Sequence, residues 1–173
     1  MTIRTTLETE RLRLRLFTHD DLDVMFELNT DPDVIKYADT AVKDMEEVRQ
    51  RLEEGPLADY KKYGYGRFAV DLKETGRMIG FCGIKYIPEI ELPEVGYRFL
   101  KAYWGQGIAT EAARACVDFA REDLGIDKLI ALIIPENIAS IRVAEKLGMS
   151  KGPLIHIYDV DALQYEMRLR DSF

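Results

Sequence analysis

The N-terminal part of the chain begins with a strict alternation of polar and apolar residues. In residues 11–17 (RLRLRLF) an apolar side chain stands at every second position, which predicts a strand with one buried face. Thr18 or Asp20 can then cap a helix that runs to about Asn29. Two further helices are predicted on either side of Gly55-Pro56, at residues 43–54 and 57–63.

The middle and C-terminal parts alternate between strand-like and helix-like patterns. Strands are predicted at residues 66–72, 77–87 and 94–100, and the turn KETG joins the first two as a hairpin. The later elements are a helix ending near Asp123, a buried strand at 128–134, a helix from Asn137 to Gly148, and strands in GPLIHIYDV and ALQYEMRL. This order predicts an α/β (α+β) fold with a single mixed, mainly antiparallel sheet and helices on both faces, in one domain spanning residues 1–173.

Composition and charge restrict the classes of partner. The chain has 173 residues and a formal net charge of −7, which argues against nucleic acid and is compatible with a cationic substrate or simply with solubility. No apolar run approaches the roughly 20 residues of a membrane span, and the charged start argues against a secretory signal. Cys82 and Cys116 lack metal-ligand spacing and are expected to be small buried residues. These features predict a cytoplasmic protein with no metal and no membrane partner.

The stretch YWGQGIATEA places two glycines directly before a helix. Gly105 and Gly107 can adopt positive φ, and the helix start offers unpaired amides and partial positive charge, which together suit a phosphate. Ile108-Ala109 stand where a Walker loop needs Lys and Ser or Thr, and a dinucleotide fingerprint is missing as well. Alone, a Gly-x-Gly turn is more often structural.

A second segment, IIPENIASIRVAEKLGM, strengthens the case for a ligand site. Asn137 and Ser140 fall at the start of a helix whose buried stripe is formed by Ile141, Ala144 and Leu147. If the strands before the two helices diverge, an extended ligand with an anionic end can lie in the slot between them.

Four segments together resemble one family. EVGYRFLKAYWGQGIATEA, NIASIRVAEKLGM, ETERLRLR and DALQYEM are similar to the GCN5-related N-acetyltransferase (GNAT) superfamily, in the branch of the ribosomal-protein alanine N-acetyltransferases. The resemblance covers nearly the whole chain. It implies a GNAT-like acyl-CoA N-acyltransferase fold and acetyl-CoA as cofactor. It also implies acetyl transfer, by direct attack in a ternary complex, to a primary amine of a protein N-terminus or a small molecule.

The resemblance also implies roles for individual residues. The backbone of Phe99 and Leu100 would pair with the pantetheine arm, Asn137 would bind that arm, and Arg142 would lie near the nucleotide. The pyrophosphate would be held by the amides of Gln106, Gly107, Ile108, Ala109 and Thr110. The sequence departs from the superfamily pattern at Trp104, where Gln or Arg is usual, and at Ala144, where many members carry a tyrosine acid.

The chemistry requires a neutral amine, whereas the leaving thiolate needs little help from an acid because thiol pKa values lie near 8.5. A lysine-type amine is about 0.04% neutral at pH 7, whereas an α-amine is about 10% neutral, so the first needs a base and the second mainly positioning. Glu94 is the candidate base, acting through water or attracting a cationic amine, with a solvated strand-end carboxylate as the alternative; Glu91 is a weaker second. Ser140 is the candidate acid for the thiolate, and it can also serve as a capping residue.

Other readings of the sequence stay open. A non-catalytic acyl-CoA-binding sensor is the alternative to an enzyme, although Glu94 and Ser140 argue mildly against it. The acceptor could be a protein α-amine, a polyamine, an amino acid or an aminoglycoside, and the protein could be a monomer or a homodimer. Tyr86, Tyr97 and Tyr158 could line an acceptor site, but each alone fits an ordinary half-buried strand position.

Overall fold

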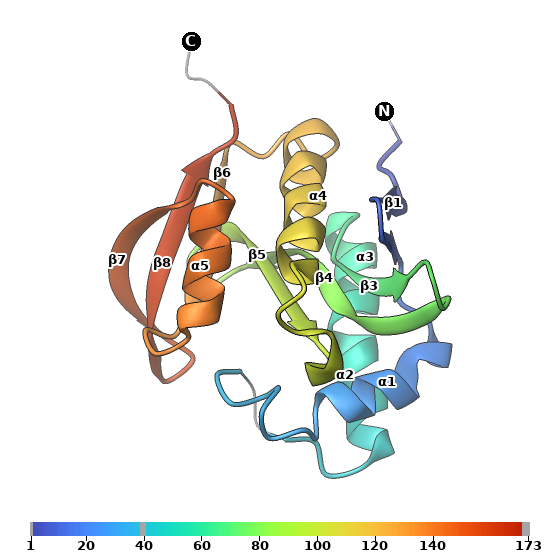
Figure 1. Ribbon diagram of the computed structural model, residues 1–173. Helices are drawn as coiled ribbons and strands as arrows, with labels where there is room; N and C mark the ends of the chain where they lie inside the picture. Colours follow the sequence, from blue (N-terminus) through green and yellow to red (C-terminus); the bar gives the residue numbers. More distant parts are fainter. Residues whose placement is uncertain (1, 39–40, 171–173) are drawn as a thin grey trace.

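One eight-stranded sheet forms the centre of the computed structural model, which describes residues 2–38 and 41–170 (Figure 1). The strand order is β1-β2-β3-β4-β5-β6-β8-β7, and every neighbouring pair is antiparallel except β5 and β6. The strands are β1 (Thr6–Glu8), β2 (Leu12–Arg15), β3 (Arg67–Leu72), β4 (Arg77–Ile87), β5 (Leu92–Phe99), β6 (Lys128–Ile133), β7 (Ser150–Ile157) and β8 (Val160–Arg168). The predicted mixed, mainly antiparallel sheet is therefore confirmed.

Helices cover both faces of this sheet. They are η1 (His19–Asp21), α1 (Leu22–Leu28), α2 (Met45–Glu54), α3 (Pro56–Tyr63), η2 (Lys101–Tyr103), α4 (Ile108–Glu122) and α5 (Ile138–Lys146). One face packs against α1 and α2 through a core that includes Leu28, Val48 and Phe81. The other packs against α4 through Phe68, Cys82 and Cys116, and α5 lies beside α4 on that face (Figure 1).

Local sequence signals explain where the helices begin and end. The Thr18 side chain caps η1 and forms a reciprocal capping box with Asp21, and the Asp44 side chain accepts from the Glu47 amide at the start of α2. Gly64, with φ of 78°, ends α3 in the left-handed conformation that glycine adopts most easily. The helix predicted from residue 18 to 29 thus starts as a 3-10 turn and continues as α1.

Two edges of the sheet differ from what the pattern alone indicates. β1 is not predicted, because three residues are too few to show an alternation; it pairs with β2 in the register Leu7↔Leu14. At the other edge, β7 leaves Leu154 56% exposed, and Pro153 lacks an N–H there, which hinders pairing with a further strand.

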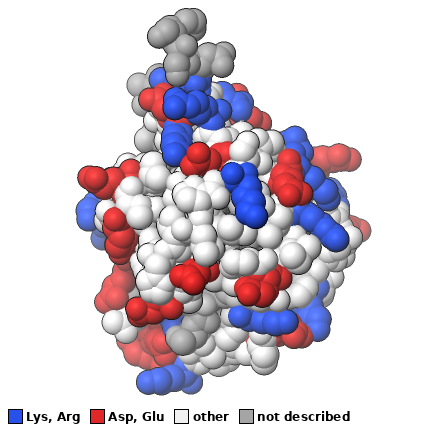
Figure 2. All heavy atoms as spheres, turned by 90° about the vertical axis from the view of Figure 1, so that its left-hand side faces the viewer, with Lys and Arg blue, Asp and Glu red and all other residues white. Residues whose placement is uncertain are grey.

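Figure 2 shows the side of the molecule that carries β7, with charges of both signs around a largely uncharged centre. Among the described residues, no helix combines the length and apolarity needed to cross a bilayer.

A cluster of charged side chains connects β2 to η1 and to β3. Arg15 on β2 bonds Asp21 through Nη2 at 2.8 Å and Asp71 on β3 through Nε at 2.8 Å. The Asp21 side chain is 5% exposed and that of Arg15 26% exposed. Removing the guanidinium would therefore leave two carboxylates poorly solvated and without their cation.

We expect Arg15→Met to lower the free energy of unfolding by about 2–3 kcal/mol, because each charged hydrogen bond lost from a partly buried site is costly. The neighbouring Arg13 is the matched control: its side chain is 56% exposed and lies 3.9 Å from Glu8. Arg13→Met should change stability by less than about 0.5 kcal/mol. Urea unfolding of both variants measures the difference, and equal losses would contradict a special role for Arg15.

Candidate active site

The two parallel strands at the centre of the sheet part almost at once. β5 pairs with β6 at Glu94↔Ile130, whereas its other edge pairs with β4 as far as Gly80↔Phe99. The Leu100 amide donates to Ile79 O on β4 at 2.9 Å, so the alternate residues Tyr97 and Phe99 direct their backbone groups to the opposite edge, towards β6. The expected divergence is present, and it leaves strand groups available to a ligand.

The glycine-rich turn lies just beyond the end of β5. Gly105 and Gly107 have φ of 72° and 79°, and Gly107 is the residue that precedes the first turn of α4. No described side chain caps this helix, and the amides of Gln106, Gly107, Ile108, Ala109 and Thr110 donate to no described residue. Free amides at a helix start are suited to a phosphate, and Gly107 has no side chain that would block its approach.

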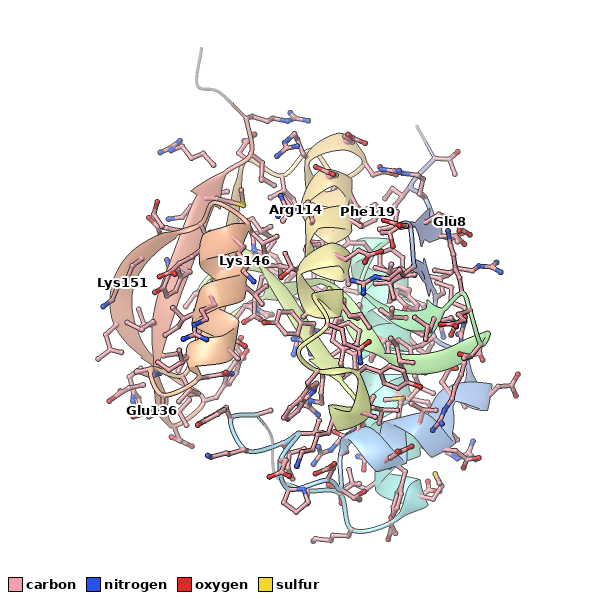
Figure 3. All side chains as sticks on the ribbon, viewed as in Figure 1. Glu8, Arg114, Phe119, Glu136, Lys146 and Lys151 are labelled. Carbon is pink, nitrogen blue, oxygen red and sulfur yellow. The ribbon has the colours of Figure 1, made fainter. Side chains whose placement is uncertain are left out.

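Two cations and an open hollow adjoin this turn. The hollow has a volume of about 580 Å³, and its lining includes Gly107, Thr110, Arg114 and Lys146. Arg114 from α4 and Lys146 from α5 lie close together, and Arg114 Nη2 donates to Lys146 O at 3.3 Å (Figure 3). The hollow is also lined by the carboxylates of Glu8, Glu10, Glu111 and Asp118, so the positive charge of Arg114 and Lys146 is confined to its side at α4 and α5.

The residues expected along the extended ligand lie in different settings. Phe99 directs its backbone to the diverging edge, where its carbonyl accepts from the Trp104 indole Nε1 at 2.8 Å. Leu100 uses both backbone groups within the protein, since its carbonyl also accepts from the Tyr103 amide at 3.0 Å. Trp104, the departure from the superfamily pattern, thus ties the turn to the end of β5.

Asn137 and Arg142 come from the start and the middle of α5. The Asn137 side-chain oxygen accepts from the Ser140 amide at 3.3 Å, so Asn137 caps α5 while its side-chain NH₂ donates to no described residue. Arg142 is exposed on the same helix.

Ser140 is joined to a residue that sequence reasoning set aside. The Tyr97 hydroxyl donates to Ser140 Oγ at 3.1 Å, across the space between β5 and α5. Burial raises the pKa of Tyr97 to about 12, so its proton stays in place at any ordinary pH. With the Tyr97 hydroxyl as donor in this bond, the Ser140 proton is available to another acceptor.

Glu94 occupies the point where β5 and β6 part. Its side chain is 11% exposed; Oε2 accepts from the Leu132 amide of β6 at 3.3 Å and Oε1 from Arg67 Nη2 at 3.3 Å. Burial raises the pKa of Glu94 above its ordinary value, and the nearby Arg67 charge offsets part of that rise. A buried carboxyl group with a raised pKa has the properties of a general base, whereas the solvated strand-end carboxylate considered above does not fit this burial. Glu91, the weaker candidate, is exposed.

The two candidate catalytic residues lie on opposite faces of the sheet. Glu94 shares its face with Phe81, which packs towards α1 and α2, whereas Val95 and Tyr97 face α4. Sequence reasoning did not identify Arg67 or the partner role of Tyr97, since both depend on strand register. The alternation of side chains along residues 94–99 was the available signal for Tyr97.

The chain matches known proteins over most of its length. The family model described as Acetyltransferase (GNAT) domain matches residues 11–150. Protein YkkB of Bacillus subtilis, which is uncharacterized, is 37% identical over 171 residues, covering 97% of this chain and 98% of that protein. The uncharacterized N-acetyltransferase p20 of Bacillus licheniformis is 34% identical over 157 residues, covering 89% and 87%.

A solved structure agrees with these matches. The acetyltransferase from Agrobacterium tumefaciens superposes with a TM-score of 0.83 at 31% identity, covering 94% of this chain and 93% of the other.

The raised pKa of Glu94 makes stability depend on pH in a defined direction. When a folded-state pKa lies above the unfolded value, the native state binds more protons between the two values, and stability falls as pH rises through them. We therefore expect wild type to lose stability relative to Glu94→Gln between about pH 4.5 and neutrality. Urea unfolding at both pH values measures this, with Glu74→Gln in the exposed β3–β4 turn as the control. A pH-independent difference for Glu94→Gln would contradict the burial effect.

Proposed function

The chain belongs to the GNAT acetyltransferase family and is an N-acetyltransferase that uses acetyl-CoA; on that premise, we propose that residues 1–173 form one domain that acetylates a primary amine, of a small molecule or a protein N-terminus, by direct attack in a ternary complex. A single observation carries this proposal. A carboxylate and a hydroxyl occupy opposite faces of the sheet where β5 and β6 diverge, next to a phosphate-type loop. We further propose a cytoplasmic location, where the buried thiols of Cys82 and Cys116 would stay reduced.

The residues around the divergence fit acetyl-CoA as the donor. The unpaired amides from Gln106 to Thr110 would hold the pyrophosphate, and Arg142, Arg114 and Lys146 would attract the nucleotide phosphates. The Phe99 backbone, with Tyr97 in the place expected for Leu100, would pair with the pantetheine arm, and the Asn137 NH₂ group would add a hydrogen bond. When bound, acetyl-CoA supplies a thioester carbonyl that a neutral amine can attack.

Glu94 is proposed to take a proton from the amine. Its carboxylate is buried, so it gains more from binding a proton than an exposed carboxylate does, and its raised pKa brings it nearer to the working pH. A backbone amide on the diverging edge of β5 would stabilise the oxyanion, because no strand pairs with that edge beyond Glu94 among the described residues.

Ser140 is proposed to give a proton to the leaving sulfur. The hydrogen bond from Tyr97 fills one acceptor position of Ser140 Oγ and leaves its own proton for a partner on the other side. Ser140 is thus polarised as a donor by a neighbour that does not ionise at working pH. Asn137 caps α5 by accepting from the Ser140 amide, so the Ser140 hydroxyl is not used in the cap.

The loop assignment is tested by Gly107→Val, which should weaken CoA binding about tenfold or more, because a β-branched side chain would stand between the amides and the phosphate. Gly76→Val is the matched control: Gly76 has a similar positive φ of 68°, and a Cβ there meets nothing within 4 Å. Calorimetry with CoA measures both. Equal affinity in Gly107→Val and Gly76→Val would remove the loop from the site.

The two catalytic roles are separated by pH–rate profiles. Glu94→Gln should lower kcat about 10²-fold near neutral pH. It should also remove the fall in kcat at low pH that comes from protonation of the Glu94 carboxylate. Ser140→Ala should lower kcat while keeping that limb, and Tyr97→Phe should act in the same direction as Ser140→Ala. Glu91→Gln, which changes an exposed carboxylate, is the control. A wild-type profile in Glu94→Gln would leave deprotonation to water.

A further inference from the structure

The carboxylate proposed as the base is accompanied by an arginine whose hydrogen-bonding capacity is largely unused. Arg67 on β3 reaches Glu94 through Nη2 at 3.3 Å, which is long for a charged hydrogen bond. Its Nε is buried and has no partner among the described residues. The Arg67 side chain as a whole is nevertheless 26% exposed, so part of it is accessible to solvent.

The sheet holds Arg67 beside Glu94 in a fixed orientation. A Cβ at Gly96 of β5 would lie 2.9 Å from Arg67 Nη2, so the guanidinium crosses β5 where glycine leaves space. The Phe81 ring lies 5.4 Å from the guanidinium carbon of Arg67, a distance typical of a cation–π contact. The unused N–H groups are therefore pre-oriented beside the base.

Further cations lie on the same face of the sheet. Lys85 is directly opposite Glu94 in the β4–β5 register, and its charge acts on the Glu94 carboxylate. Arg98 also lies 5.4 Å from the Phe81 ring, where Asn29 Oδ1 accepts from its Nη1 at 2.6 Å. Arg67 on β3 and Lys85 on β4 thus supply positive charge to the buried Glu94 carboxylate from two strands.

We propose that the acceptor is a small zwitterionic amine of the α-amino acid class, whose carboxylate binds Arg67 while its ammonium group binds Glu94. This inference rests on the proposed function and specifies its substrate. An α-amino acid carries a cationic amino group next to an anionic carboxylate. Glu94 beside Arg67 presents the opposite charges in the same arrangement, so each charged group of the ligand meets a protein group of opposite charge. Two ion pairs with the ligand then replace one long ion pair within the protein.

Other amine classes match these charges less well. A polyamine carries no anion, so its charges would meet the guanidinium of Arg67 as well as Glu94, and like charges repel at this range. A peptide N-terminus has an amide where an amino acid has its carboxylate, so it would leave Arg67 without an ionic partner.

Binding of the zwitterion also prepares the base. Once the substrate carboxylate occupies Arg67, the guanidinium charge acts less on Glu94, and the substrate ammonium, which is the proton donor, becomes the cation nearest to the Glu94 carboxylate. The ammonium proton passes to Glu94, the neutral nitrogen forms its bond to the acetyl carbon, and the bond from that carbon to sulfur breaks. The sulfur takes its proton from Ser140, and the second proton that the nitrogen loses on becoming an amide restores the Ser140 hydroxyl through solvent. Glu94 then releases its own proton to solvent.

The test compares acetylation of α-amino acids with that of their α-carboxamides and of the corresponding decarboxylated amines. We expect kcat/KM for at least one amino acid to exceed that for its carboxamide about tenfold to a hundredfold. This preference would oppose the intrinsic trend, because the carboxamide has the less basic and therefore more abundant neutral amine. Arg67→Met should remove the preference for the amino acid over its carboxamide. Arg67→Lys, which retains the charge and guards against misfolding, should reduce the kcat/KM ratio of acid to carboxamide without removing it. Arg77→Met, at an exposed arginine 3.4 Å from Glu27, should leave the ratio unchanged.

The outcomes separate this inference from the proposed function. Acetylation of polyamines or peptide N-termini with inert amino acids would overturn the amino acid assignment and leave amine acetylation standing. An unchanged acid-to-amide ratio in both Arg67 variants would also overturn it. CoA binding without acetylation of any amine in the panel would overturn both proposals.

Discussion

The early separation of β5 from β6 is the constraint on which the site depends. A strand edge without a partner leaves amide and carbonyl groups that must be satisfied in another way. Here the Glu94 carboxylate accepts from the Leu132 amide, and the Trp104 indole donates to the Phe99 carbonyl. Glu94 and Trp104 therefore stabilise the fold by bonding to backbone groups that have no strand partner, which also places them at the site. The remaining backbone groups on the unpaired edge of β5 are available to the substrates.

The two-residue period of a strand then divides the catalytic roles. Glu94, Gly96 and Arg98 project to the face covered by α1 and α2, whereas Val95, Tyr97 and Phe99 project to the face covered by α4. A group that receives a proton from the amine and a group that returns one to sulfur must act from different sides of the carbonyl. In the proposed mechanism Glu94 meets this requirement from one face of β5, and Ser140 of α5 meets it from the other face, where it is hydrogen-bonded to Tyr97.

Local signals were sufficient for the longer elements but not for the three-residue strand β1 or for the contacts between elements. Gly105 and Gly107, through their backbone conformation, and Asn137, through its capping side chain, define the helix starts, because each acts on residues close to it in sequence. Arg67 meets Glu94 only through the registers of β3 with β4 and of β4 with β5, which no local pattern contains. The same register commits the Leu100 amide to β4, so residues that are adjacent in sequence differ in what they can offer a ligand.

In a negatively charged protein that binds a phosphate-bearing substrate, acidic side chains close to the glycine-rich turn would repel the phosphate unless their charge is neutralised. Glu111 lies in the first turn of α4, where it favours the helix but would repel a phosphate. Burial raises its pKa, but the bonds from the Arg11 backbone amide, from Thr9 Oγ1 and from Arg11 Nε outweigh burial and lower the pKa overall. Arg11 Nη1 also donates to Gln106 O at 2.9 Å, so one guanidinium neutralises the acid and holds the turn. Arg11, the residue directly before β2, thus supplies positive charge beside the glycine-rich turn and offsets the Glu111 carboxylate there.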